Sequence, residues 1–278
     1  MVLILFLFAL PLLAQMPARA KQGEVIKLVL PTPGPLKAKL GDAPEVPLFN
    51  QPTGGVAGLV PVAVTLKPGS YDFLILDAKG HTVSSSKVQV LDGKYPIQNI
   101  QASKGMKELV PLPGEMEAMR ALATTVTAEK QWQIPFLLPV TECRNSPFGV
   151  LRYHNGKPGG NYHRGLDLRA PMGRPIHAPA AGTVKVAQMF RLHGGTVGID
   201  HGQGVTSHYL HMSKIEAVEG KQVQAGDLLG YSGATGFATG PHLHWGLYVF
   251  GVPTNPERWV KKVQYCAPRA SAKSAKKK

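Results

Sequence analysis

Beyond its first fourteen residues, the sequence has no apolar run long enough to cross a bilayer as a helix. It also has no cysteine just after that opening run that could accept a lipid. The 278 residues are 44% hydrophobic and include 24 prolines and 31 glycines, which indicates a loop-rich globular protein dominated by β-structure. This length suits two domains.

The opening apolar run, Met1 to Ala14, is short for a membrane span and has the length of a secretory signal core. Ala18 and Ala20 follow it and form a cleavage site of the A-x-A kind. We predict a signal peptide over residues 1–20 and export to the periplasm or the extracellular cell envelope. Cleavage after Ala14 is an alternative. The run lacks the usual positive charge at its start, so an uncleaved anchor is a further interpretation.

Only two cysteines are present, Cys143 and Cys266, and they bracket the segment that contains most of the histidines. In an exported protein such a pair can form a disulfide, here between the two ends of a domain. Two unpaired thiols are the alternative.

Acidic residues are absent after Glu257, whereas eight lysines and arginines follow it. More than half of the formal net charge of +14 therefore lies at the C-terminal end. We predict a disordered basic tail over residues 263–278, because its alanines, serines and lysines cannot bury a core. The charge favours contact with anionic cell-envelope polymers, and plain solvation is the simpler interpretation. Nucleic acid is disfavoured because no aromatic residue alternates with the final lysines.

The first half of the chain predicts a small β-sandwich over residues 21–93, with no catalytic cluster. Short β-type runs alternate with Pro/Gly turns there, at 25–30, 60–66, 71–76 and 83–91. The sequence Tyr71-Asp72-Phe73, after a Pro-Gly-Ser turn, resembles the strand entry of an immunoglobulin-like module. Residues 94–138 read as a connector with one helix, expected over Glu115 to Thr127 and packed between the domains.

From about Pro139 the sequence returns to turn-rich β-structure, and nine of the ten histidines lie in this half. Strands are expected at 182–188, 195–200, 205–210, 226–230 and 242–249. This concentration of histidines makes residues 139–262 the place to look for chemistry.

The segment Gly240-Pro241-His242-Leu243-His244-Trp245-Gly246 places two imidazoles at positions i and i+2. On an extended strand His242 and His244 share one face, while Leu243, Trp245, Leu247 and Val249 share the other and are expected to form core. The histidine face offers a metal ligand with a second imidazole beside it. A purely structural pair is the alternative.

Earlier in this half, His163 and Asp167 lie four residues apart with Gly165 between them, so that the backbone can bend and both side chains can converge. With His244 they form an N/O/N triad that leaves one tetrahedral position for water, as in a catalytic rather than a structural zinc site.

A third histidine segment is His208-Tyr209-Leu210-His211-Met212-Ser213. If residues 205–211 form one regular strand, His208 and His211 point to opposite faces, and only one of them joins the site.

Five ordered segments resemble the lysostaphin-type, LytM-like zinc endopeptidases of bacterial cell walls. They are His163-x-x-x-Asp167, Tyr209-Leu210-His211-Met212-Ser213, Val223-Gln224-Ala225-Gly226-Asp227-Leu228-Leu229-Gly230, Gly233-Ala234-Thr235-Gly236 and Gly240-Pro241-His242-Leu243-His244. The resemblance covers about residues 148–260. It implies an antiparallel β-sheet peptidase domain, and it favours His211 over His208.

This resemblance implies one Zn²⁺ held by His163, Asp167 and His244, with His211 and His242 as the catalytic pair. It further implies peptide cross-bridges or stem peptides of peptidoglycan as the substrate. No glutamate lies in an HExxH helix, so a carboxylate base is not indicated. Arg164 and Lys157 are candidates to contact acidic stem peptides, although solvated charge is the simpler interpretation.

The principal alternative is a LytM-like module that no longer cleaves and instead activates a separate wall amidase. A zinc-stabilised wall-binding module without turnover is a third possibility. Degenerate modules have lost ligands, whereas all five site residues are present here, and this favours catalysis.

Overall fold

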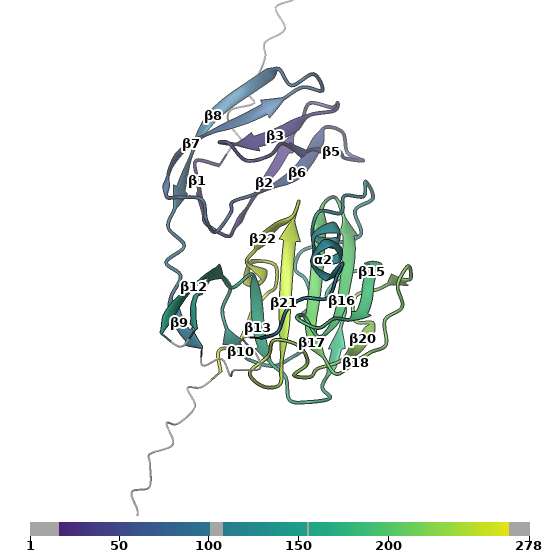
Figure 1. The fold of residues 1–278 in the computed structure, drawn as a ribbon. Helices are drawn as coiled ribbons and strands as arrows, with labels where there is room; N and C mark the ends of the chain where they lie inside the picture. The colour runs from purple at the N-terminus through teal and green to yellow at the C-terminus, as the bar shows by residue number, and fades with distance from the viewer. Residues whose placement is uncertain (1–16, 101–107, 155, 267–278) are drawn as a thin grey trace, which may run out of the picture.

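The computed structural model describes residues 17–100, 108–154 and 156–266, and it has two β-rich parts (Figure 1). The N-terminal part lies at the top of the view, and the larger C-terminal part lies below it with helix α2 on its face. The expectation of a mainly β protein is confirmed. No helix among the described residues is both long enough and apolar enough to cross a membrane. The predicted signal core and most of the predicted tail lie outside these residues.

The N-terminal part consists of two sheets that share one core. The larger sheet has the order β1-β8-β7-β3-β4 and the smaller has the order β2-β6-β5. Their strands are β1 (Arg19–Lys21), β2 (Val25–Leu30), β3 (Lys37–Leu40), β4 (Val46–Pro47), β5 (Phe49–Asn50), β6 (Val56–Pro61), β7 (Gly69–Leu76) and β8 (Thr82–Leu91). In β2, Ile26, Leu28 and Leu30 are buried in alternation with more exposed neighbours, as a strand with one core face requires. The immunoglobulin-like class of this sandwich stays a prediction.

Strand β1 includes the predicted signal cleavage position. Ala20 is buried in the sandwich, and the strand pairs in parallel with β8. Cleavage after Ala20 would therefore remove two of the three residues of β1.

The predicted connector contributes strand β9 (Ile97–Ile100) and helix α2 (Glu115–Ala123). The helix ends four residues before the predicted Thr127. The hydroxyl of Thr124 donates to the carbonyl of Arg120, and that of Thr125 donates to the carbonyl of Ala121. These β-branched residues bond back to the last turn and close the helix.

Helix α2 is fixed to the C-terminal part by a buried carboxylate. Glu115 is 0% exposed and accepts from the backbone N–H groups of Leu192 (3.0 Å) and His193 (2.9 Å) and from the His193 ring (2.6 Å). Burial alone would raise the pKa of Glu115, but these donors and the Leu112 N–H hold it below its usual value. The helix is therefore anchored beside the 190–194 loop and packs against three neighbouring strands of the C-terminal part, while its predicted place between the domains stays a prediction.

The C-terminal part is built on an eight-stranded antiparallel sheet with the order β10-β13-β21-β17-β16-β15-β19, in which β22 also pairs with β21. These strands are β10 (Arg144–Ser146), β13 (Gly165–Arg169), β15 (Gly182–Met189), β16 (Gly195–Gly202), β17 (Val205–Met212), β19 (Gln222–Val223), β21 (His242–Val249) and β22 (Val252–Thr254). Two three-stranded sheets flank it. One contains β9, β11 (Leu151–His154) and β12 (Lys157–Tyr162), and the other contains β14 (Pro175–His177), β18 (Lys214–Ile215) and β20 (Leu228–Tyr231). A short 3₁₀-helix, η2 (Pro256–Arg258), follows β22. The predicted antiparallel sheet is confirmed.

The predicted core face of β21 is confirmed, because Leu243, Trp245, Leu247 and Val249 are each 0% exposed. The core they join also contains Trp132 and Phe136 from the predicted connector, which pack against Trp259. The opposite face of β21 carries the two histidines.

Of the two interpretations open for the cysteines, the structure has the disulfide between the ends of this part. Cys143 and Cys266 form a disulfide with a Cα–Cα distance of 4.9 Å. The guanidinium of Arg144 stacks on Tyr265, 4.0 Å from the ring centroid. Residues 263–266 are thus held against the domain by the disulfide and this stacking, so the first residues of the tail predicted over 263–278 are ordered, and the others lie outside the described residues.

Candidate metal centre and adjoining cleft

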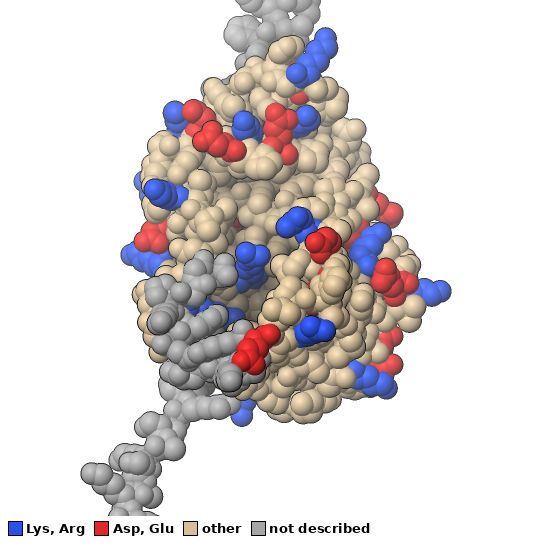
Figure 2. Space-filling model, in the orientation of Figure 1, with Lys and Arg blue, Asp and Glu red and all other residues tan. Residues whose placement is uncertain are grey.

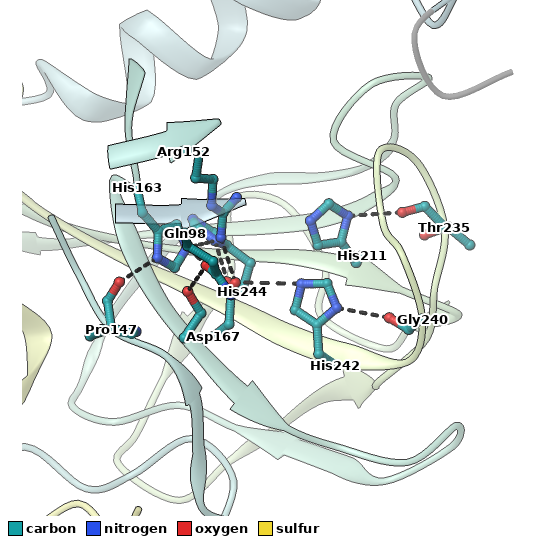
Figure 3. Close-up of polar contacts among 11 residues, drawn as sticks. Gln98, Pro147, Arg152, His163, Asp167, His211, Thr235, Gly240, His242 and His244 are labelled. Atoms are coloured by element: carbon teal, nitrogen blue, oxygen red, sulfur yellow. Dashed lines mark hydrogen bonds and ion pairs between the residues drawn. The ribbon is translucent and has the colours of Figure 1, made fainter. Parts of the chain in front are cut away.

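The residues predicted as metal ligands lie together on one face of the large sheet (Figure 3). Asp167 on β13 is directly opposite His244 on β21, so both side chains leave the sheet on the same side. His163 follows β12 and precedes β13, and Gly165 lies between it and Asp167. The sequence spacing and the strand register therefore bring about the predicted convergence.

The three ligand atoms form a nearly equilateral triangle. Nε2 of His163 is 2.9 Å from Oδ1 of Asp167 and 3.1 Å from Nδ1 of His244, which is itself 2.9 Å from Oδ1 of Asp167. Donors about 2.0–2.1 Å from a tetrahedral zinc ion are separated by roughly 3.3 Å, close to these distances.

The tautomer of His163 supports a cation at this point. Its Nδ1–H donates to the carbonyl oxygen of Pro147 at 2.7 Å, which leaves a lone pair on Nε2 when the ring is neutral. The Nε2 lone pair of His163 and a carboxylate oxygen of Asp167 thus face each other, and a cation bound between them would accept both as ligands. The donor set fits zinc, and the role of the three residues as its ligands stays a prediction.

Charge in the triangle is consistent with metal binding. Burial alone would raise the pKa of Asp167, but His163 and His244 hold it well below its usual value, so the carboxylate is ionised. Burial lowers the pKa of His244 to about 4, which keeps this imidazole neutral at pH 7, as a ligand must be.

The second oxygen of Asp167 is held by Arg152, a residue that sequence reasoning missed. Nη2 of Arg152, on β11, donates to Oδ2 of Asp167 at 2.6 Å. This contact leaves Oδ1 as the oxygen that faces both histidines. No motif marks Arg152, because β11 reaches Asp167 only through tertiary packing.

His242 and His211 lie next to the triangle with their rings 4.9 Å apart. Nδ1–H of His242 donates to the carbonyl of Gly240 at 2.8 Å, and Nδ1–H of His211 donates to the carbonyl of Thr235 at 2.9 Å. The Nε2 of His242 lies 3.8 Å from Oδ1 of Asp167. Each backbone carbonyl fixes a tautomer in which Nε2 of the neutral ring can accept a proton.

The expectation that His208 and His211 point to opposite faces is wrong. His211 has a φ of 65°, in the left-handed region, so it does not continue the alternation of β17. His208 lies opposite Gly246, on the face that Leu210 and His244 share, and it also lines the cleft beside the triangle. One non-extended residue thus places both histidines on the same side of the sheet.

A cleft of about 690 Å³ adjoins the triangle and has walls from three parts of the chain. Residues 63–65 come from the sandwich, Met116 and Met119 come from α2, and His163 and His244 come from the C-terminal part. Figure 2 shows the hollow between the upper and lower parts, with basic side chains at its edge. Sequence reasoning predicted α2 but gave no indication that it forms a wall of this cleft.

Comparison with known proteins gives the same assignment for the C-terminal part. Residues 161–256 match Peptidase family M23, so the resemblance to LytM-like endopeptidases is confirmed. Peptidases of this family are zinc enzymes.

Among curated relatives, the DD-carboxypeptidase/endopeptidase Mpg of Neisseria meningitidis is 38% identical over 112 residues, which are 40% of this chain and 26% of the relative. The peptidoglycan DD-endopeptidase ShyA of Vibrio cholerae is 41% identical over 93 residues, which are 34% of this chain and 22% of the relative. The chain thus spans about a quarter of the length of these relatives.

One solved structure is similar over most of the chain. It is the crystal structure of a candidate M23 peptidase from Pseudomonas aeruginosa, with a TM-score of 0.66 and 28% identity. The match covers 90% of this chain and 96% of that one, so the similarity in fold extends well beyond the peptidase domain.

Proposed function

We propose that this chain, whose residues 161–256 form a domain of peptidase family M23, is an exported zinc metalloendopeptidase. Its substrates would be peptide cross-links or stem peptides of bacterial peptidoglycan. The observation that carries the proposal is the triangle of His163, Asp167 and His244, which has two further imidazoles beside it and adjoins a cleft. The names of the relatives from Neisseria and Vibrio support the choice of substrate.

Zinc bound by the triangle would supply a water that ionises near pH 7 and a Lewis acid for the scissile carbonyl. The chain itself sets the geometry. Arg152 neutralises the outer oxygen of Asp167, and Pro147 fixes the ring of His163. Both contacts orient ligand atoms before a substrate arrives, as the supporting contacts of metal ligands do.

His242 is placed to move the proton. Its Nδ1–H is held by Gly240, so its Nε2 lone pair lies on the side of the triangle, 3.8 Å from Oδ1 of Asp167. A neutral imidazole there can accept a proton from water and return it to the leaving amine.

His211 is placed to orient the water rather than to donate to the oxyanion. Burial lowers the pKa of His211 to about 3, and His242 and His244 lower it as well, so the ring is neutral. Its Nδ1–H donates to the carbonyl of Thr235, which leaves Nε2 of the neutral ring as an acceptor. Donation from Nε2 would require the disfavoured protonated ring.

Metal analysis combined with digestion of purified peptidoglycan tests the proposal. We expect one zinc per chain, lost in His244→Ala and in Asp167→Ala. His242→Ala should keep its zinc and lose roughly 100-fold or more of the cleavage rate, as expected for loss of a general base. The released fragments, identified by mass, reveal which bond is cut.

A zinc-loaded wild-type chain that leaves cross-linked fragments intact would contradict the enzyme proposal. Stimulation of a separate wall amidase by that inactive chain would then favour the activator alternative. Retention of zinc by both ligand variants would contradict the assignment of the metal site.

The site of action follows from the substrate. Peptidoglycan lies in the cell envelope, so the proposal includes export by the predicted signal over residues 1–20. Contact between the basic C-terminal residues and anionic envelope polymers is part of the same proposal.

A further inference from the structure

The wall of the cleft contains a buried histidine that the proposed chemistry does not use. His208 is 2% exposed, and both of its ring nitrogens are buried without a hydrogen-bond partner among the described residues. Its ring stacks on Tyr248, with the centroids 4.2 Å apart. Buried polar groups normally have partners, so an imidazole without one beside a cleft indicates a group that arrives from outside.

The local shape of the sheet presents His208 to that group. Gly246 lies opposite His208 on β21, and a Cβ there would approach Tyr248 to 2.9 Å and His208 to 3.5 Å. The missing side chain leaves room for the rings of Tyr248 and His208 to stack on each other. His244, two residues before Gly246, shares this face.

The permanently charged side chains that line the cleft around His208 are all positive. The described residues that line the cleft include Arg120, Arg152 and Arg164, and no aspartate or glutamate. Arg152 is engaged with Asp167. Burial raises the pKa of the Tyr248 hydroxyl, and the positive charge of Arg164 opposes this rise. Arg164 is thus close enough to Tyr248 for an electrostatic interaction.

Helix α2 closes the opposite wall. It contributes Arg120 together with the apolar side chains of Met116 and Met119. A peptide lying in the cleft would therefore have its apolar parts against the methionines, with cations on both sides.

We propose that His208, Tyr248, Arg164 and Arg120 form a subsite for a carboxylate on the substrate peptide, next to the bond that is cleaved. The inference rests on the proposed function, because it names a specificity determinant of the same cleft. A neutral imidazole donates one N–H, and arginine provides a planar, permanently charged donor that matches a carboxylate. The carboxylate would supply the partner that His208 lacks.

Binding of native and amidated muropeptides separates this subsite from catalysis. Cross-linked muropeptide dimers from purified peptidoglycan are titrated calorimetrically into the full-length, zinc-loaded His242→Ala chain. The same dimers are then amidated with carbodiimide and ammonia, which converts each carboxylate to a carboxamide. We expect the native dimers to bind about tenfold more tightly, at an ionic strength that screens long-range attraction.

Two variants in the same background locate the preference. Arg164→Gln removes an exposed cation, and His208→Phe keeps the ring stacked on Tyr248 but removes its nitrogens. Each should reduce the preference for native dimers to about threefold or less. Lys221→Gln, an exposed cation outside the cleft, is the matched control and should leave the preference unchanged.

Thermal stability distinguishes binding from support of the fold. Because the nitrogens of His208 have no partner, His208→Phe should not lower the Tm. Equal binding of native and amidated dimers by the parent chain, or an unchanged preference in both variants, would overturn the subsite. Failure of the zinc-loaded wild-type chain to cleave peptidoglycan would overturn the enzyme proposal instead, and the binding preference would still decide the subsite.

Discussion

At the scale of single residues, the site depends on positions where the backbone departs from a regular strand or lacks a side chain. His211 reaches His242 because its φ is 65°. A non-glycine residue in this region is uncommon, and strain of this kind persists only where the surrounding structure holds it. Here the His211 N–H donates to the carbonyl of His193, and its ring donates to Thr235.

Gly165 is the second such position, and it gives a direct test of the metal centre. A Cβ at Gly165 would lie 2.6 Å from Nε2 of His244 and 2.6 Å from the carbonyl oxygen of Trp245. Gly165→Ala should therefore displace the His244 ring and weaken zinc binding by roughly 10–100-fold, as changes around metal ligands do. Competition titration with a chromogenic chelator measures the affinity.

Gly240→Ala is the matched control for this substitution. A Cβ at Gly240 would meet no atom within 4 Å, although the Gly240 carbonyl contacts His242. It should retain wild-type zinc affinity. An unchanged affinity in Gly165→Ala would show that the His244 ring does not need this space.

At the scale of elements, hydrophobic alternation predicts the strands well and their ends less well. Val25–Leu30 and His242–Val249 match their predicted bounds, because each run has one apolar face bounded by turn residues. The strand predicted at 60–66 lies instead at Val56–Pro61, since Pro61 ends it and pairing with β2 extends it backward.

The site was predictable where spacing alone fixes geometry. His163, Asp167 and His244 follow from strand alternation and from a recognisable order of segments. Arg152 and the wall formed by α2 did not follow, because each depends on packing between segments that no local pattern connects. The expected divergence of His208 and His211 was wrong for a related reason, since the φ of His211 is set by its neighbours in space.

The fit of α2 against the sheet can be tested by a double-mutant cycle. A Cβ at Gly198 on β16 would lie 2.1 Å from a methyl carbon of Leu122, which is 2% exposed. Gly198→Ala should therefore lower the free energy of unfolding by about 1–3 kcal/mol through overpacking. Leu122→Ala should cost about 2–5 kcal/mol by leaving a cavity.

The double variant should be more stable than the sum of these losses predicts, by about 0.5–3 kcal/mol, because the new methyl group occupies space that Leu122 vacates. Denaturant unfolding of the four proteins measures the coupling. Additive losses would mean that α2 does not press on Gly198 in solution.

At the scale of the whole molecule, the disulfide between Cys143 and Cys266 closes a loop with a sequence separation of 123 residues. In the chain-entropy account, a loop of this length stabilises the folded state by up to about 5 kcal/mol, while typical measured values are 2–4 kcal/mol. The paired variant Cys143→Ser/Cys266→Ser should show a loss in that range by denaturant unfolding.

Mild reduction of the wild-type chain should reproduce this loss, and it should have no effect on the paired variant. Zinc content should be retained at temperatures where the reduced chain stays folded, because neither cysteine lies in the triangle. Equal stability of the oxidised and reduced chains would contradict a stabilising role for the disulfide.

The packing of Trp132 and Phe136 against Trp259 sets a minimum length for any segment that could be moved to another protein as a folded peptidase domain. The family match covers residues 161–256, yet the backbone N–H of Phe136 donates to the carbonyl of Trp259, and β9 pairs with the strand that holds Arg152. A graft cut at the limits of the match would keep the three ligand positions but lose these three aromatic side chains, and the core that they cover would be exposed. The segment that sequence similarity recognises is therefore shorter than the segment that must fold.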